Sequence, residues 1–184
     1  MQPEYGCTNA IRVPAIGETE SSRDGRKYII KSVFVSGNVT GGVMQDQADV
    51  QEAPQCFVAL VLDPQANAAT IVSEQVYTNP NDSAFVNMRL HRNLQYTSRY
   101  KVVAWKRVNL GPVVTMTDGA STSSQRVQAR AFTLSWHGTL PVQCVGTTAD
   151  VASVTDNAFH VIAFATTTDF VPLLTYNART RFIG

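Results

Sequence analysis

The chain has 184 residues, of which 44% are hydrophobic and 16% are charged, and its formal net charge is +1. This length and composition suit one globular domain with a substantial core, and they exclude an intrinsically disordered chain. The sequence has no run of about 20 apolar residues, and its acidic N-terminal region lacks the basic and then apolar order of a secretory signal. We therefore expect synthesis in the cytosol or nucleus.

Four strand-like segments follow one another along the chain, over residues 26–37, 56–63, 98–108 and 157–169. They are rich in β-branched and aromatic residues and are separated by Gly, Pro, Asn and Asp, which favour turns. The second segment stops at Asp63-Pro64, because proline lacks a backbone donor and restricts the residue before it. Residues 40–54 are polar and predict a loop.

Weaker patterns fill the rest of the chain. We expect a strand over 69–77, a short helix over 83–90, strands over 127–136 and 140–145 separated by a turn at His137-Gly138-Thr139, and a last strand over 173–183. The total of about eight strands predicts an all-β fold, an eight-stranded single jelly-roll sandwich of two four-stranded antiparallel sheets. We assign residues 23–184 to this domain and residues 1–22 to an N-terminal extension.

The charges are unevenly distributed. Residues 1–82 carry five Lys or Arg against ten acids, whereas residues 83–184 carry ten against four. Between residues 83 and 117 there are six cations and no acid. Such a patch attracts polyanions. The alternative is that these are solvated positions beside strands, with counter-charges supplied by other parts of the fold.

The segment 98–108 alternates. One face would carry Tyr100, Val102, Ala104, Lys106 and Val108, and the other Arg99, Lys101, Val103, Trp105 and Arg107. The first face is typical of a core and the second is basic around an indole. A cationic strand face with an aromatic ring suits a sugar-phosphate backbone and a stacked base. The alternative is that Trp105 anchors the sandwich while the cations extend past it.

No motif indicates an enzyme. His91, His137 and His160 are scattered without the spacing of a metal site, and the sequence has no nucleophile elbow and no phosphate-binding glycine loop. Cys144 and His160 could be read as a catalytic nucleophile pair, but in a chain with three Cys and three His such pairs arise by chance. We interpret His160 as a satisfied core histidine.

We expect no cofactor. Cys7, Cys56 and Cys144 show no metal-binding spacing and are interpreted as reduced packing residues. Asp46, Asp49 and Glu52 could hold a structural calcium ion but lack regular ligand spacing, so a solvated acidic loop is favoured.

The order of several segments carries a family resemblance. These are RDGRKYIIKSVFVSG (23–37), ALVLDPQANAA (59–69), NMRLHRNLQYTSRYKVVAWKRVNL (87–110), TLSWHGT (133–139), NAFHVIAFATTTD (157–169) and NARTRFIG (177–184). In this order they resemble the capsid proteins of small circular, Rep-encoding single-stranded DNA viruses, whose coat is of the satellite tobacco necrosis virus type. Two differences are that residues 1–22 hold one arginine, Arg12, where that family has a basic arm, and that Ala68 stands where it has glycine.

The resemblance implies a single jelly roll that self-assembles into an icosahedral shell of the smallest class (T=1) around a single-stranded genome, most simply DNA, in a virion. It assigns nucleic-acid contacts to the lead-in to the first strand, to the basic stretch and to the closing strand. Those candidates are Arg23, Arg26, Lys27, Arg99, Lys101, Trp105, Lys106, Arg107, Arg179 and Arg181. No membrane partner is implied.

Assembly also has a rationale in the residues themselves. Sheet edges and apolar loops need cover, and closed symmetry uses one patch many times. The candidate subunit contacts are Val43, Met44, Val113, Val114, Met116, Phe170 and Val171. A jelly-roll ligand-binding module, of the lectin or trimeric cytokine kind, is the alternative function. A cupin-like metal enzyme would need clustered histidines and ranks last.

Overall fold

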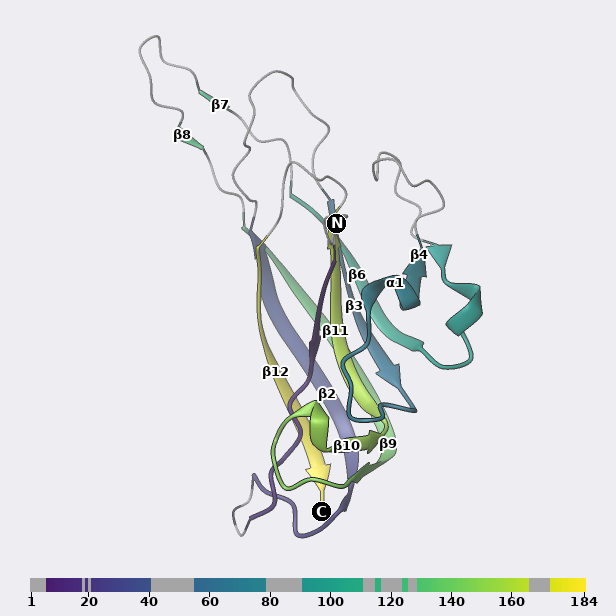
Figure 1. Ribbon diagram of the computed structural model, residues 1–184. Helices are drawn as coiled ribbons and strands as arrows, with labels where there is room; N and C mark the ends of the chain where they lie inside the picture. Colours follow the sequence, from purple (N-terminus) through teal and green to yellow (C-terminus); the bar gives the residue numbers. More distant parts are fainter. Residues whose placement is uncertain are drawn as a thin grey trace.

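Two four-stranded sheets packed face to face make up the protein (Figure 1). The computed structural model describes residues 6–17, 19, 21–40, 55–78, 91–110, 115–116, 124–125, 129–165 and 173–184. All pairings within the two sheets are antiparallel. The predicted eight-stranded all-β sandwich is therefore confirmed.

The chain crosses repeatedly between the sheets, as in a jelly roll. The first sheet has the order β1 (Gly6–Ala10), β11 (Ala158–Ala165), β3 (Gln55–Asp63), β6 (Lys101–Asn109). The second has the order β10 (Val154–Asp156), β9 (Ala129–Cys144), β2 (Lys27–Thr40), β12 (Leu173–Ile183). The smaller elements are α1 (Ser73–Val76), β4 (Tyr77–Thr78), β5 (His91–Arg92), η1 (Leu94–Tyr96), β7 (Thr115–Met116), β8 (Ser124–Gln125) and η2 (Val151–Ser153).

The core lies between the sheets and is built by alternation along the strands. In β2, Val33 and Val35 are fully buried while Phe34 between them is 45% exposed. Leu60 of β3 and Phe132 of β9 meet these valines from both sheets. Burial of such apolar side chains is the main stabilising contribution in a sandwich of this size. Cys56 and Cys144 lie in this core, as predicted, and the side chain of Cys7 lies outside the described residues.

A second apolar cluster covers the outer face of the first sheet. Residues 64–78 and 91–100 cross this face, and α1 and β4 lie on its outer side (Figure 1). Ile71, Val76 and Tyr100 pack on Val61 and Ile162 of the sheet. The strand predicted over 69–77 is therefore wrong. Its apolar residues serve as a lid that packs on the sheet, and the segment forms only α1 and the short β4.

The turn predicted at residues 137–139 is wrong, because these residues lie within strand β9. Residues 129–144 form one strand through the predicted turn, with a register shift against β2 between Ile30 and Ser32. Gly138 lies at this irregularity, and a Cβ added there would be 2.7 Å from the Trp136 ring. Glycine allows the ring to lie over the backbone, so the break in the pattern marks a β-bulge rather than a chain reversal.

The N-terminal residues are part of the sandwich. Gly6–Ala10 pair with β11 as β1, and Ile11 and Val13 enter the core. The expectation that residues 1–22 stand outside the domain is wrong for this stretch. Its single short strand lacks the aromatic and β-branched density that identified the other strands. The predicted helix over 83–90 lies outside the described residues.

Candidate nucleic-acid interface

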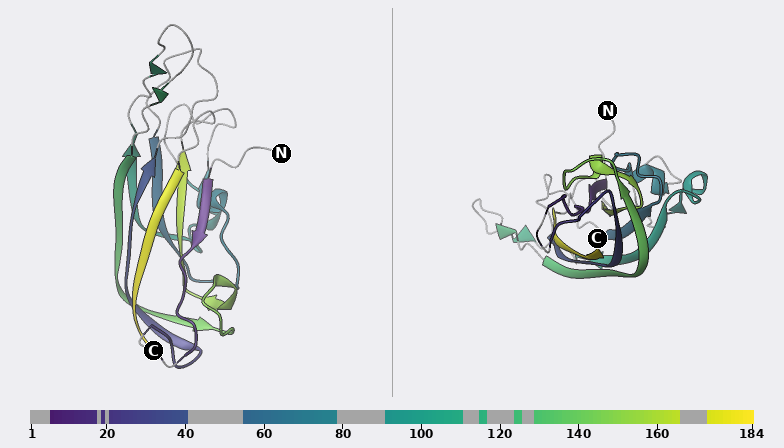
Figure 2. Two further views of the ribbon diagram at one scale, coloured as in Figure 1. Left: turned by 90° about the vertical axis from the view of Figure 1, so that its left-hand side faces the viewer. Right: turned by 90° about the horizontal axis from the view of Figure 1, so that it is seen from below.

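The outward side of the second sheet gathers cations, hydroxyls and one aromatic ring. We call it the basic face and define it by its outward residues: Lys27, Lys31, Ser32, Phe34 and Ser36 of β2; Thr133, Ser135 and His137 of β9; Asn177, Arg179 and Arg181 of β12. Strands β2, β9 and β12 contain no Asp or Glu, and the one acid among the strands of this sheet is Asp156 of β10, which pairs with Gln143. The face lies on the opposite side of the molecule from α1 and β4 (Figures 1 and 2).

Strand register places these side chains in rows. Phe34 pairs with Ser135 on one side and with Arg179 on the other. The next row holds Ser32 between His137 and Arg181. Directly paired residues in an antiparallel sheet share a face, with Cβ atoms about 5 Å apart. A ring 45% exposed therefore lies beside one guanidinium and about two residues from a second.

The basic face has the chemistry of a single-strand platform. Arginine and lysine neutralise phosphates, hydroxyl and amide groups position the backbone, and an exposed ring can stack on a base without reading its identity. Lys31 donates to the Thr139 hydroxyl at 3.2 Å, which holds its ammonium near the same face. Among the described residues the one ion pair is Arg99–Asp63, so the cations of this face have no acidic partner there.

Two of the predicted residues on the lead-in and all those on the closing strand keep accessible positions. Arg26 and Lys27 are exposed at the start of β2, and Lys27 pairs with Gln143. Arg179 and Arg181 are exposed on β12. The structure brings Lys27, Arg179 and Arg181 to one face, whereas Arg26 precedes the strand.

Arg23 has a different position from the one that its prediction requires. It is fully buried, and its guanidinium donates to the carbonyl oxygens of Pro14 (2.9 Å), Gly25 and Gly146. These contacts tie the N-terminal stretch to the segment after β9. A buried guanidinium that is satisfied by carbonyls cannot also bind phosphate, so the prediction that Arg23 contacts nucleic acid is wrong.

Arg99 is only partly buried, with 32% of its side chain exposed, but its guanidinium is engaged by other groups of the fold. Its Nη2 lies 3.1 Å from Oδ2 of Asp63, a carboxylate with no exposed surface, and it also donates to the Gln65 carbonyl at 3.0 Å. The hydrogen bond to Asp63 raises the pKa of Arg99. The guanidinium lies 4.9 Å from the centre of the Tyr100 ring. Arg99 thus links the segment of residues 91–100 to the end of β3, which is a structural role.

A bulge divides the rest of the predicted basic strand. Leu60 pairs with Ala104 while the next residue, Val61, pairs with Val102, so Val103 is an extra residue in β6. Such a bulge reverses which side chains face outward beyond it. Lys101 pairs with Leu62 and Lys106 with Val58, both core residues, so neither lysine shares a face with Trp105 and Arg107. The predicted face that joined Lys101 to Trp105 and Arg107 is therefore wrong, whereas the predicted separation of Lys106 from these two residues is confirmed.

Trp105 lies on the outer face of the first sheet and is 62% exposed, so it is not a core anchor. Its ring centre is 6.1 Å from that of Phe57, and the Arg107 guanidinium lies 5.7 Å from the Phe57 ring centre. This cluster is a second exposed aromatic and cationic site. It is separate from the basic face, because the two lie on different sheets.

The candidate subunit contacts lie largely outside the described residues. This applies to Val43, Met44, Val113, Val114, Phe170 and Val171, and Met116 is described only through the backbone of β7. The possible calcium ligands Asp46, Asp49 and Glu52 also lie outside.

Other chemistry is sparse in the part of the chain that the structure describes. No three His, Cys, Asp or Glu residues gather there as a metal site, and no helix there is long and apolar enough to cross a membrane. His160 is fully buried as predicted, but neither ring nitrogen has a hydrogen-bond partner. Burial lowers the pKa of His160 to about 4, and burial raises the pKa of the Cys144 thiol.

Sequence reasoning missed Phe34, Lys31 and His137 as members of the basic face. The signal was present in residues 31–38, where Val33 and Val35 alternate with Phe34 and serines. Such an alternation indicates a strand with one buried and one exposed face. No protein-family model matches the chain, and no curated protein matches it.

Proposed function

We propose that this chain is a structural subunit that assembles with copies of itself into a closed shell, of the viral capsid kind, and holds single-stranded nucleic acid on the basic face. The observation that carries the nucleic-acid part is the acid-free surface of β2, β9 and β12 with Phe34 exposed among Arg179 and Arg181. Strands without a single carboxylate favour a polyanionic partner. The sandwich fold and the order of the segments support the assembly part.

Binding can be measured by fluorescence polarisation with a labelled oligothymidylate over a range of salt concentrations. The double variant Arg179→Ala/Arg181→Ala is expected to weaken binding and to reduce the slope of log K against log salt by roughly 1.4, because each single-strand phosphate contact contributes about 0.7. Phe34→Ala is expected to cost about 1–3 kcal/mol with little change in the slope, since it removes stacking rather than charge.

A matched control changes the same net charge on the other sheet. Lys106→Ala/Arg107→Ala removes two exposed cations of β6 and leaves the basic face intact. We expect near wild-type affinity for this variant. Equal losses in both double variants would mean that only net charge matters and that the basic face is no site. Circular dichroism of each variant establishes that the fold is retained.

Size-exclusion chromatography and negative-stain microscopy test assembly. Uniform shells are the expected result, and a monomer or trimer at every salt concentration and pH would contradict it. The trimer would favour the second candidate, a ligand-binding module of the lectin kind. Trp105 supports that candidate, because an indole 62% exposed beside Phe57 offers a stacking surface for a sugar ring. Its cationic neighbour Arg107 fits a sugar less well than a carboxylate would.

A further inference from the structure

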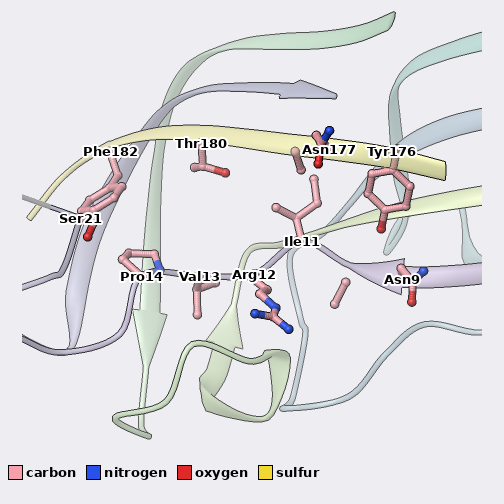
Figure 3. Close-up of a pocket in the computed structure, with 12 residues that line it drawn as sticks. Asn9, Ile11, Arg12, Val13, Pro14, Ser21, Tyr176, Asn177, Thr180 and Phe182 are labelled. Carbon is pink, nitrogen blue, oxygen red and sulfur yellow. The ribbon is translucent and has the colours of Figure 1, made fainter. Parts of the chain in front are cut away.

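A groove runs along one open side of the sandwich, between β12 and residues 9–14 (Figure 3). Its volume is about 650 Å³, and its walls include Ile11, Val13 and Pro14 on one side and Tyr176, Thr180 and Phe182 on the other. In Figure 3 the Tyr176 and Phe182 rings point from β12 toward the opposite wall. The groove is therefore a lengthwise gap between β12, at the edge of the second sheet, and residues 9–14, which begin at the end of β1, the edge strand of the first sheet.

The core-facing side of β12 is poorly covered. Ala178 pairs with the fully buried Val35 and so shares its inward direction, yet Ala178 is exposed. Tyr176 and Phe182 face the same way and are only half-buried. On β2 next to it, by contrast, the inward valines have no exposed surface. The edge of the second sheet thus leaves apolar surface that its own described chain does not bury.

The backbone of β12 has the same deficit. This strand of 11 residues pairs with β2 on one side and with no described strand on the other. Its free side borders the groove, since Asn177 and Ala178 line it beside the inward side chains. A long edge strand presents a row of unpaired N–H and C=O groups that can accept another strand. The opposite side of the sandwich is closed, because β6 packs against β9 there.

We propose that the groove binds an extended segment of a partner polypeptide, which adds to β12 as a fifth strand of the second sheet. Main-chain hydrogen bonds to β12 supply affinity, and alternate side chains enter the groove, as in other cases of strand addition. The inward residues of the partner segment are apolar, to match Ile11 and Phe182. The outward residues are neutral or acidic, because Arg179 and Arg181 flank them on the outward side of β12.

A second copy of β12 fits the groove less well. Two β12 strands paired across a twofold axis would satisfy each other's main chain. Each would still direct its inward side chains into its own subunit, so both grooves would stay open. The volume between β12 and residues 9–14 therefore favours a strand whose side chains are additional to those of β12. This inference does not depend on nucleic-acid binding.

The test supplies the strand within the chain itself. An Asn-Gly turn followed by nine residues of alternating Val and Thr or Glu is appended after Gly184, which follows the end of β12. The control has the same extension with proline at three of the Val positions, which removes strand pairing. The readouts are the thermal midpoint and the hydrogen exchange of the β12 amides.

We expect the strand extension to raise the thermal midpoint by about 4 °C or more over the proline control. Exchange of alternate β12 amides should slow by at least about tenfold. Ala178→Phe fills the groove from an exposed position and should abolish both gains while leaving the unextended protein folded. Equal midpoints and equal exchange for the two extensions would overturn the proposal. Protection of β12 in the unextended protein that appears only at high concentration would also overturn it, because a second copy would then occupy the edge.

Discussion

Acidification is expected to weaken the sandwich through His160. This side chain is fully buried on β11 and neither of its ring nitrogens is hydrogen-bonded within the described chain. Its pKa falls from 6.5 to about 4 because burial disfavours the imidazolium. Two charged groups act on it in opposite directions: Asp63 of β3 raises the pKa and Arg99 lowers it. Their ion pair makes these two effects partly cancel, so burial dominates.

The sign and size follow from proton linkage. Between the folded and unfolded pKa values the unfolded chain binds a proton that the folded protein excludes, so stability falls as the pH falls. The contribution is fully present above pH 6.5 and is lost as the pH approaches about 4. At about 1.4 kcal/mol for each pKa unit, the shift corresponds to about 3 kcal/mol at its limit. A loss of this size is a large part of the stability of an ordinary domain.

Urea unfolding of wild type and His160→Met between pH 7 and pH 4.5, followed by circular dichroism, measures this contribution. Methionine has a similar volume and does not titrate. Over this pH range the free energy of unfolding of His160→Met should therefore fall by about 2–3 kcal/mol less than that of wild type. His137→Met is the matched control on the exposed basic face and should keep the wild-type fall, because His160 is retained. Parallel pH profiles for wild type and His160→Met would refute the reasoning.

Three further substitutions test the structural roles assigned above by urea unfolding at pH 7. Arg23→Met should cost about 3 kcal/mol or more, because it leaves the three carbonyls of a buried site without their donor; a loss below about 0.5 kcal/mol would contradict the buried role. Arg99→Ala should cost about 2–3 kcal/mol, because it leaves the carboxylate of Asp63 buried and unpaired, and a neutral result would show that water reaches it. Ala68→Gly should stabilise the fold by about 0.5–1 kcal/mol, since Ala68 has φ of 58°, where a Cβ is strained; any destabilisation would contradict this.

Strand identity was largely predictable from sequence, whereas the faces of the strands were not. Residues 173–183 and 56–63 were located almost to the residue, because β-branched density and flanking turn residues are local signals. The bulge at Val103 reversed the predicted faces of Lys101 and Val102 but not those of residues 104–108, since a bulge depends on how the partner strand β3 is paired. The bulge at Gly138 looked like a turn for the same reason. A local alternation therefore predicts a strand but predicts its faces only up to the first bulge.

The sequence also could not predict which of the cations are buried. Arg23 and Arg181 are indistinguishable as letters beside strands, yet one is fully buried and the other exposed. The difference arises from the Gly146 carbonyl, 123 residues away from Arg23 in the chain. The fold brings these groups together, so only the three-dimensional arrangement separates a structural arginine from an available one.

The structural roles of two arginines limit the number of phosphate contacts that one subunit can make. Once Arg23 and Arg99 are assigned to the fold, the basic face keeps Lys27, Lys31, Arg179 and Arg181, and the whole chain carries a net charge of only +1. About four phosphate contacts give weak binding by one subunit at physiological salt. Many subunits in a closed assembly would engage one strand together, and linked sites raise the overall affinity far above that of each. Nucleic-acid retention should therefore appear with assembly. Shells should retain an oligonucleotide at a salt concentration where isolated subunits release it. Equal retention by shells and isolated subunits would contradict the proposal that retention depends on assembly.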